Sequence, residues 1–458
     1  MSIFHQEKGF YRSLLSLALP AAGASLLQNA VGLADTFMVG SLGDDAVAAI
    51  AAANKFFFIF SLLLFGLVSG ASVLAAQYWG KRDREAISRI AGIVLGISLS
   101  AGFFFAAAAA FFPRQILSVF TGDPAVIGLG VGYLRLIAAT FLTSSFSAAY
   151  WSFLRSIEKA GLGLAVQLLA FFSNTFFNAV FIFGLFGAPK MGVNGAALGT
   201  LLSRSLECLA VLIYAVFFRK DIRLRPRDFW RWDRALLRDF FRYSSVVLLN
   251  DLLWGIGNSL QIAVLGHIST PAMTAASVVM TIQGVVTVTT FGMASAAGVL
   301  VGKTIGRGHF GEAKRQCQFL LLLAVGVGLL CSAAQLLIRS YGVDAAVSAG
   351  LFHLTGEAVA LMRQMLLLGA CLFPVMACNF TLVMTLRSGG DTKVSALIDV
   401  GFMWLISFPA AALAAFVLRW PPTAVLFLLN SEELLKCLFF LPRMLRWRWM
   451  RNVTRSAQ

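Results

Sequence analysis

Charged residues are scarce in this chain. Asp, Glu, Lys and Arg together make up 13% of its 458 residues, whereas apolar residues make up 59%. A soluble domain carries about 25% charged residues. The composition therefore excludes an ordinary soluble protein, and the mean hydropathy of +0.82 indicates a protein embedded in a membrane.

Residues that bind metal ions or carry out covalent chemistry are also few. The four histidines (His5, His267, His309 and His353) are scattered along the chain, and the six cysteines form no CxxC pair. Cysteines in apolar segments are usually small buried thiols. We therefore expect no cofactor and no dedicated metal centre. An integral membrane enzyme would need a His-rich metal site or a Ser/His pair at the membrane face, and the sequence gives no support for either.

Long apolar runs are what the chain has in abundance. About 20 apolar residues in a helix span the roughly 30 Å of bilayer hydrocarbon, and these runs lack the weak alternation of transmembrane β-strands. Twelve runs qualify, at residues 14–38, 46–78, 89–111, 128–153, 162–186, 193–217, 240–265, 273–301, 317–338, 358–385, 394–417 and 423–444. The sequence thus predicts an all-α integral membrane protein with 12 transmembrane helices.

The distribution of Lys and Arg predicts the orientation in the membrane. Most of the 37 basic residues fall in the N-terminus, the even-numbered loops and the C-terminal tail, whereas the opposite loops carry only Arg114, Lys190, Arg339 and Arg419. Basic residues collect on the cytoplasmic side, so we expect a multi-pass protein of the cell (inner) membrane with both termini cytoplasmic. The net charge of +16 then reflects topology, and we expect no nucleic-acid partner.

Two stretches of the chain repeat each other. Residues 66–80 read GLVSGASVLAAQYWG and residues 292–306 read GMASAAGVLVGKTIG, and at an offset of 226 they share six of 15 positions. A second echo, LRS at 154–156 and at 386–388, follows in the same order. The chain is therefore one half built twice. In a membrane protein, this suggests a transporter with its site between the halves.

The one long polar stretch lies in the middle of the chain. Residues 219–242 contain nine basic residues interleaved with Phe and Trp. This pattern is typical of a segment on the headgroup surface, and a regulator-binding segment is the alternative. The stretch divides the chain into two six-helix lobes, 1–218 and 243–458, joined by the linker 219–242. Both lobes enter from the cytoplasm, so we expect a pseudo-symmetry axis along the membrane normal.

Ionisable residues inside the apolar runs are the best pointers to function. An acid at the centre of a spanning helix costs about 2.5–3.5 kcal/mol on insertion scales, so it usually faces a cavity or a partner. Asp35 lies in the first run, 15 residues after Pro20, a hinge candidate because proline removes one helix hydrogen bond. Low dielectric disfavours a charged carboxyl group, so Asp35 could exchange a proton, and its oxygens could equally bind sodium. A structural hydrogen bond is the alternative.

Polar residues of the fifth and sixth runs complete this candidate site. Asn174 and Asn178 are four residues apart and share one helix face, and Thr200 follows the small-residue segment GVNGAALG. These oxygens and amides could form a polar cluster with Asp35. Taken alone, each side chain is explained equally by a hydrogen bond between packed helices.

The second half offers a second candidate site. Asp251 in the seventh run lies near Trp254, and a carboxylate beside an aromatic ring suits a cationic ligand or a second proton site. Asp399 in the eleventh run and Gln283 in the eighth are further candidates for substrate binding or coupling.

The two halves place their acids differently. In the internal alignment the counterpart of Asp35 is Gln261, and the counterpart of Asp251 is Ser25. This difference suggests unequal roles for the halves.

Other intramembrane acids have a simpler explanation. Arg204 and Glu207 are three residues apart, and Glu432 and Lys436 are four apart. Each pair shares a helix face, so we expect structural ion pairs.

Several segments, taken in order, resemble the multidrug and toxic-compound extrusion (MATE) family of secondary transporters, within the multidrug/oligosaccharidyl-lipid/polysaccharide flippase superfamily. They read ALP and DTFMVGSLG in the first run, GVNGAALGT in the sixth, NDLLWGIG in the seventh, LRSGGDTK after the tenth and SEELLK in the last. The resemblance covers essentially the whole chain. It implies a V-shaped pair of six-helix lobes that works as a monomer in the bilayer. It also implies antiport, in which cationic or amphipathic organic compounds leave while protons or sodium ions enter.

The resemblance also assigns residues. Asp35 falls at the family's cation-coupling acid, the polar residues of the fifth and sixth runs at its companions, and Asp251 where many members have Glu. Two departures make the sites less acidic here. Asn178 stands where some members have Asp, and Met376 where some have an acid in the tenth helix.

A flippase for lipid-linked precursors is the alternative within the same superfamily. It would need a large cationic groove for a pyrophosphate group. The basic residues inside or near the runs are spread over four helices, which argues against such a groove. They are Lys55, Arg135, Arg204 and Arg363.

Overall fold

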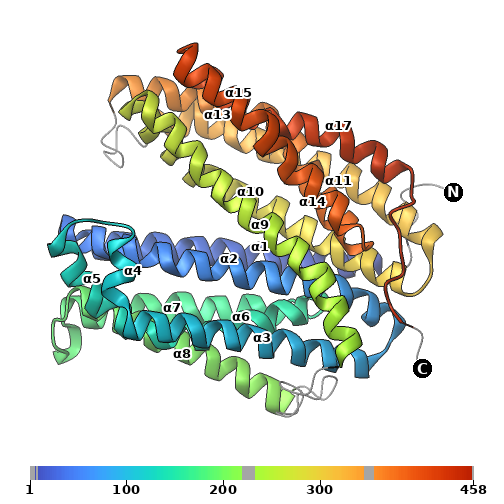
Figure 1. Ribbon diagram of the computed structural model, residues 1–458, viewed down its shortest axis with the longest axis horizontal. Helices are drawn as coiled ribbons and strands as arrows, with labels where there is room; N and C mark the ends of the chain where they lie inside the picture. Colours follow the sequence, from blue (N-terminus) through green and yellow to red (C-terminus); the bar gives the residue numbers. More distant parts are fainter. Residues whose placement is uncertain (1–5, 7–8, 219–232, 345–354, 456–458) are drawn as a thin grey trace. The chain divides into compact units, whose positions relative to one another are not determined.

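The computed structural model describes the chain except residues 1–5, 7–8, 219–232, 345–354 and 456–458, and the described part is helical without strands (Figure 1). The α-helices are α1 (Phe10–Gly40), α2 (Asp44–Lys81), α3 (Arg84–Phe111), α4 (Pro113–Ser118), α5 (Pro124–Leu136), α6 (Ala138–Ser156), α7 (Gly161–Phe183), α8 (Val193–Ile213), α9 (Arg234–Ile268), α10 (Thr270–Gly306), α11 (Phe310–Leu337), α13 (Gly356–Ser388), α14 (Thr392–Phe402), α15 (Phe408–Ala412), α16 (Pro422–Asn430) and α17 (Glu432–Leu445). Single π-helical turns extend α8 and α11 and join α14 to α15.

Each predicted apolar run coincides with helix. In the described part of the chain, ten helices are long and apolar enough to cross a membrane. The predicted run 128–153 is the pair α5 and α6, bent by 48°, which together make an eleventh candidate. The predicted run 423–444 is divided at Ser431 into helices of nine and 14 residues, too short to span singly. The prediction of an all-α membrane protein is confirmed.

Polar side chains define where several helices begin. Asp83 and Asp123 accept backbone N–H groups at 3.0 and 2.8 Å in the first turns of α3 and α5. Ser269 and Thr355 accept in the same way at the starts of α10 and α13. The first N–H groups of a helix have no helical partner, so these caps fix the helix ends at the loops.

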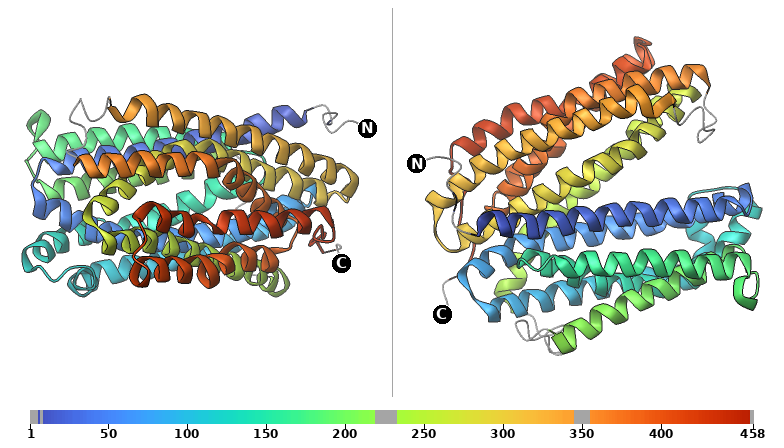
Figure 2. Two further views of the ribbon diagram at one scale, coloured as in Figure 1. Left: turned by 90° about the horizontal axis from the view of Figure 1, so that it is seen from above. Right: turned by 180° about the vertical axis from the view of Figure 1, so that it is seen from behind.

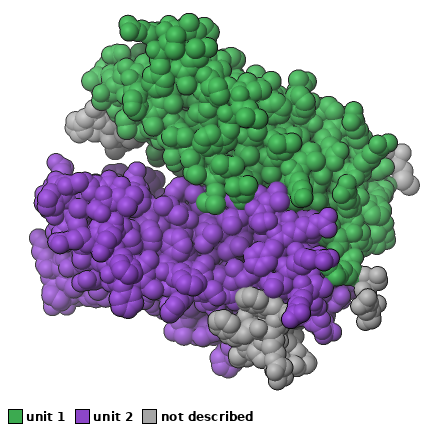
Figure 3. All heavy atoms as spheres, in the orientation of Figure 1, with its two compact units in different colours: residues 1–22, 249–458 green, residues 23–248 purple. Residues whose placement is uncertain are grey.

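The structure groups the chain into two compact units (Figure 3). Unit 1 contains residues 1–22 and 249–458, and unit 2 contains residues 23–248. Each unit therefore takes part of α1 and part of α9. The predicted lobe boundaries remain a prediction, since most of the linker 219–242 lies outside the described residues.

The repeated segments make equivalent close contacts, one in each unit. In unit 2, a Cβ atom on Gly66 of α2 would lie 2.6 Å from the Cα of Leu248 on α9. In unit 1, a Cβ on Gly292 of α10 would lie 2.9 Å from the Cβ of Ala22 on α1. Leu248 and Ala22 are separated by 226 residues, the offset of the repeat. The glycines thus allow two backbones to approach closely at matching places.

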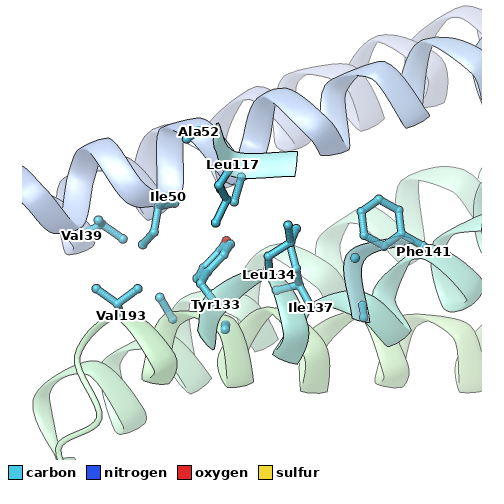
Figure 4. Close-up of a cluster of buried hydrophobic side chains, with 14 of the residues drawn as sticks. Val39, Ile50, Ala52, Leu117, Tyr133, Leu134, Ile137, Phe141 and Val193 are labelled. Carbon is cyan, nitrogen blue, oxygen red and sulfur yellow. The ribbon is translucent and has the colours of Figure 1, made fainter. Parts of the chain in front are cut away.

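A large apolar cluster fills unit 2 around α2, α5 and α6 (Figure 4). Phe60 and Phe141 are fully buried in it, with ring centroids 5.0 Å apart. Tyr133 of α5 and Val39 of α1 belong to the same cluster. Val39 is one helical turn after Asp35, so the cluster reaches the turn of α1 next to the first candidate site.

Candidate functional site

Three of the predicted coupling residues meet in unit 2. Asn178 of α7 donates from Nδ2 to Asp35 Oδ1 of α1 at 2.6 Å, and also to Asn174 Oδ1 at 3.3 Å. Both asparagines are buried, and Asp35 is partly exposed. The i, i+4 spacing on α7 therefore places two amides side by side, as the sequence predicts. One of these amides, Asn178, contacts the acid.

Asn178 also offers an acceptor. Among the described residues its Oδ1 has no hydrogen-bond partner, although the side chain is 1% exposed. This oxygen lies against Gly199 of α8, where any side chain would collide with it. Helices α7 and α8 run side by side, as Figure 2 shows. The glycine therefore keeps open a buried oxygen next to a carboxylate, an arrangement suited to a proton or a small cation.

Thr200 lies on α8 beside a tyrosine that the sequence analysis did not select. The Thr200 side chain interacts with the Tyr133 hydroxyl, and Tyr133 is within electrostatic reach of the Asp35 carboxylate. Arg204, one turn further on, pairs with Glu207 at 2.6 Å and is also within electrostatic reach of Asp35. The predicted Arg204–Glu207 ion pair is confirmed. In addition, its guanidinium places a positive charge near the candidate site.

Asp251 and Asp399 meet in unit 1, from α9 and α14. Asn250 Nδ2 bridges them, at 3.3 Å from Asp251 Oδ1 and 2.9 Å from Asp399 Oδ2. Arg387 of α13 donates to Asp251 Oδ1 at 3.1 Å and lies 3.7 Å from Asp399 Oδ2. A ligand cation at Asp251 would therefore have to compete with this guanidinium.

A second cation continues the cluster towards α17. The ammonium group of Lys436 is 1% exposed and lies 3.3 Å from Asp399, 3.3 Å from Glu432 and 3.5 Å from Glu433. Asn379 donates to Glu433 at 2.7 Å. The predicted Glu432–Lys436 pair is thus confirmed as part of a larger buried network. Asp399, which has no partner nearby in sequence, finds its partners through the fold.

Gln283 lies in a pocket of unit 1 among α9, α10, α13 and α16, and none of the described acidic residues lines this pocket. Gln261, the repeat counterpart of Asp35, lines the same pocket. Pro20, the hinge candidate, lies inside α1 close to Ala22, the last residue of that helix in unit 1.

The sequence analysis missed Arg387 as a site residue, and it missed the contact between Lys436 and Asp399. Arg387 carried a signal, because its LRS triplet repeats that of Arg155. Lys436 appeared only as the partner of Glu432, since its contact with Asp399 joins separate helices. Such contacts have no local signature in the sequence.

Comparison with known proteins gives consistent results. The family model described as MatE matches residues 20–180 and 248–413. A probable multidrug resistance protein NorM of Bradyrhizobium diazoefficiens is 28% identical over 405 residues, which cover 88% of this chain and 86% of that protein. The corresponding protein of Agrobacterium fabrum is 25% identical over 431 residues, covering 91% and 90%.

Solved structures share the fold. An outward-facing multidrug resistance MATE family transporter of the MOP superfamily superposes with a TM-score of 0.84 at 19% identity. The match covers 97% of this chain and 98% of that one. The 12-helix transporter fold therefore accounts for nearly the whole chain.

Proposed function

Because this chain belongs to the MatE family, we propose that it is a secondary active antiporter that exports cationic or amphipathic organic compounds in exchange for protons or sodium ions. The names of its relatives, probable multidrug resistance proteins, support export of drugs and toxins. We place it in the cell membrane with both termini in the cytoplasm, because basic residues dominate the corresponding loops.

The hydrogen bond between Asp35 and Asn178 is the observation that carries this proposal. It places the carboxylate of α1 against a buried amide pair on α7. An acid held by neutral partners changes its charge when a proton or sodium ion binds. The amides supply an N–H group to the charged form and oxygen atoms to a bound cation.

Coupling requires only that ion and substrate prefer different conformations. In the proposed cycle, the coupling ion binds Asp35 and favours one conformation, and the substrate favours the other. Ion binding then weakens substrate binding by the same factor that substrate weakens ion binding. A coupling free energy of about 1–3 kcal/mol corresponds to roughly 5–150-fold in affinity, which is enough for net transport.

Lipid-linked pyrophosphates fit this chain less well as substrates. Such a substrate would need buried cations that are free to bind phosphate. The buried Arg387 and Lys436 are already paired with carboxylates. We therefore favour organic compounds over lipid-linked precursors as cargo.

Ethidium efflux from proteoliposomes that contain the full chain tests the proposal. The liposomes receive an imposed proton gradient or an imposed sodium gradient of equal size. We expect one of the two gradients to accelerate efflux over passive leak, and that gradient names the coupling ion. Efflux equal to leak with both gradients would contradict the proposal.

A further inference from the structure

Unit 1 contains a pocket that is lined by none of the acidic residues described above. It lies among α9, α10, α13 and α16, is partly open, and has a cavity volume of about 40 Å³. About 10–15 Å³ of such volume holds one water molecule. The pocket therefore has room for more than a single ion, and a larger ligand can extend through its open side.

The walls of this pocket carry no charge. Among the described residues that line it, the polar side chains are the amides Gln261, Gln283 and Asn430, and the rest are apolar. Asn430 uses its Nδ2 to donate to Leu426 O at 2.9 Å, which leaves its Oδ1 to accept. An amide offers both donors and acceptors, so the walls can satisfy either kind of group on a neutral ligand.

A fourth amide lies unsatisfied behind one wall. Gln335 of α11 is fully buried, and within the described structure neither its Nε2 nor its Oε1 has a hydrogen-bond partner. Its Nε2 would lie 2.6 Å from a Cβ on Gly369, a residue that lines the pocket, and Gln283 Nε2 lies against the same glycine. Leaving a buried amide unpaired costs about 1–3 kcal/mol. Gly369 thus provides the gap through which both amides approach the pocket.

In the internal repeat, a residue of this pocket corresponds to a residue of the candidate coupling site. Gln261 lies 226 residues after Asp35, the offset of the repeated segments. At equivalent positions, the first half therefore carries the carboxylate Asp35 beside two amides, and the second half carries the amide Gln261 in a pocket lined by other amides. The acids of unit 1 do not compensate, because Arg387 and Lys436 are bound to them.

Three methionines belong to the apolar wall. Met280, Met365 and Met376 line the pocket. Their side chains are flexible and polarizable, so they adapt to differently shaped rings and contact aromatic faces favourably. The wall therefore suits a family of flat compounds rather than one fixed shape.

We propose that this pocket binds uncharged, flat aromatic compounds that carry both a hydrogen-bond donor and an acceptor, as one substrate class of the transporter. The inference rests on the proposed antiport function for its cargo role. An organic cation of the same size would lose its hydration without meeting a counter-charge. The amides instead pair with neutral N–H and C=O groups.

Equilibrium binding to the purified full chain, without any gradient, tests the proposal. The probes are acridone, which is neutral and carries one N–H and one C=O, and 10-methylacridinium, a cation with the same three rings. Both are fluorescent, so titration gives their affinities directly. The variants are Gln283→Met, which removes an amide at similar size, and Gly369→Ala, which adds a methyl group against two amides. Gln115→Met, at an exposed position of α4 in unit 2, is the control.

We expect acridone to bind the unsubstituted chain and the control equally. Gln283→Met and Gly369→Ala should each weaken acridone binding by roughly tenfold, about the effect of one lost hydrogen bond. Neither variant should change the affinity for 10-methylacridinium by more than about twofold, since the pocket offers the cation no specific partner. Unchanged acridone binding in both folded variants, or an equal loss for the cation, would overturn the proposal.

The transport assay separates this inference from the antiport function. Suppose that ethidium efflux is driven by a gradient but acridone affinity is unchanged in both variants. This result would contradict the proposed pocket and would leave the antiport function supported. Amide-dependent acridone binding without gradient-driven transport of any dye would support the pocket as a binding site and count against the antiporter.

Discussion

At the scale of single residues, the candidate acids of the two units have different kinds of partner. Asp35 is held by the neutral amide of Asn178. Asp251 and Asp399 instead share the guanidinium of Arg387, and Lys436 completes the pairing of Asp399. A carboxylate held by an amide can change its charge state without leaving a buried cation alone, whereas one paired with an arginine cannot.

Removing Arg387 should therefore destabilise the fold. Arg387→Met leaves Asp251 and Asp399 buried without this cation, which costs about 3–5 kcal/mol when a buried pair is broken. Thermal unfolding in detergent should show the loss, and the added substitution Asp251→Asn should recover part of it.

The repeat supplies a matched control for this test. Arg155, the counterpart of Arg387, donates to the Ser152 hydroxyl at 3.0 Å and lies 5.5 Å from the Trp151 ring centroid. We expect Arg155→Met to cost less than Arg387→Met. Equal unfolding temperatures for the two variants would show that the ion pairs of Arg387 contribute nothing to stability.

The sequence predicts residue contacts only where they are local. The Arg204–Glu207 and Glu432–Lys436 pairs follow from helical spacing and are present. The Arg387–Asp251 pair joins residues 136 positions apart and could not be predicted. The Asp35–Asn178 contact spans 143 positions, and it was suggested by the polar residues inside the apolar runs and by the family resemblance, not by local spacing.

At the scale of elements, apolar length is enough to predict most helices. The exceptions are breaks inside a run. The bend between α5 and α6 falls at Ile137, where neither proline nor glycine marks it. The break before α17 falls at Ser431, beside Glu432 and Glu433, which turn inward to Lys436. Neither position carries the proline or glycine that would mark a break, and hydropathy does not report either one.

The repeated glycines make a prediction about helix packing. Gly292→Ala would place a methyl group 2.7 Å from the carbonyl oxygen of Ala18 and 2.9 Å from the Cβ of Ala22. Overpacking of this kind costs about 1–3 kcal/mol, so the unfolding temperature in detergent should fall.

Gly284→Ala in the same helix is the control for that substitution. A Cβ at Gly284 meets nothing within 4 Å, and alanine is the better helix former by about 0.5–1 kcal/mol. We expect this variant to be as stable as the unsubstituted chain or more so. If Gly292→Ala leaves the unfolding temperature unchanged or raises it, then the close approach of α1 and α10 does not explain why the repeat has glycine at this position.

At the scale of the whole molecule, the duplication explains both the similarity and the division of labour. The family model matches two segments, one in each half. The compact units divide after Ala22 and after Leu248, positions separated by the repeat offset of 226. On this common plan, we propose that one half carries the ion-coupling acid and the other a neutral substrate pocket. Ion and substrate then act on different halves of one protein.

The central claim is that Asp35 couples ion entry to export. Ethidium efflux from proteoliposomes, driven by the active gradient, tests it with Asp35→Asn, which keeps the size of the side chain and removes its charge. Asp45→Asn, at an exposed position of α2, is the matched control. We predict that Asp35→Asn reduces gradient-driven efflux to the passive leak while the protein stays folded and the control transports normally. Normal gradient-driven efflux by Asp35→Asn would contradict the account.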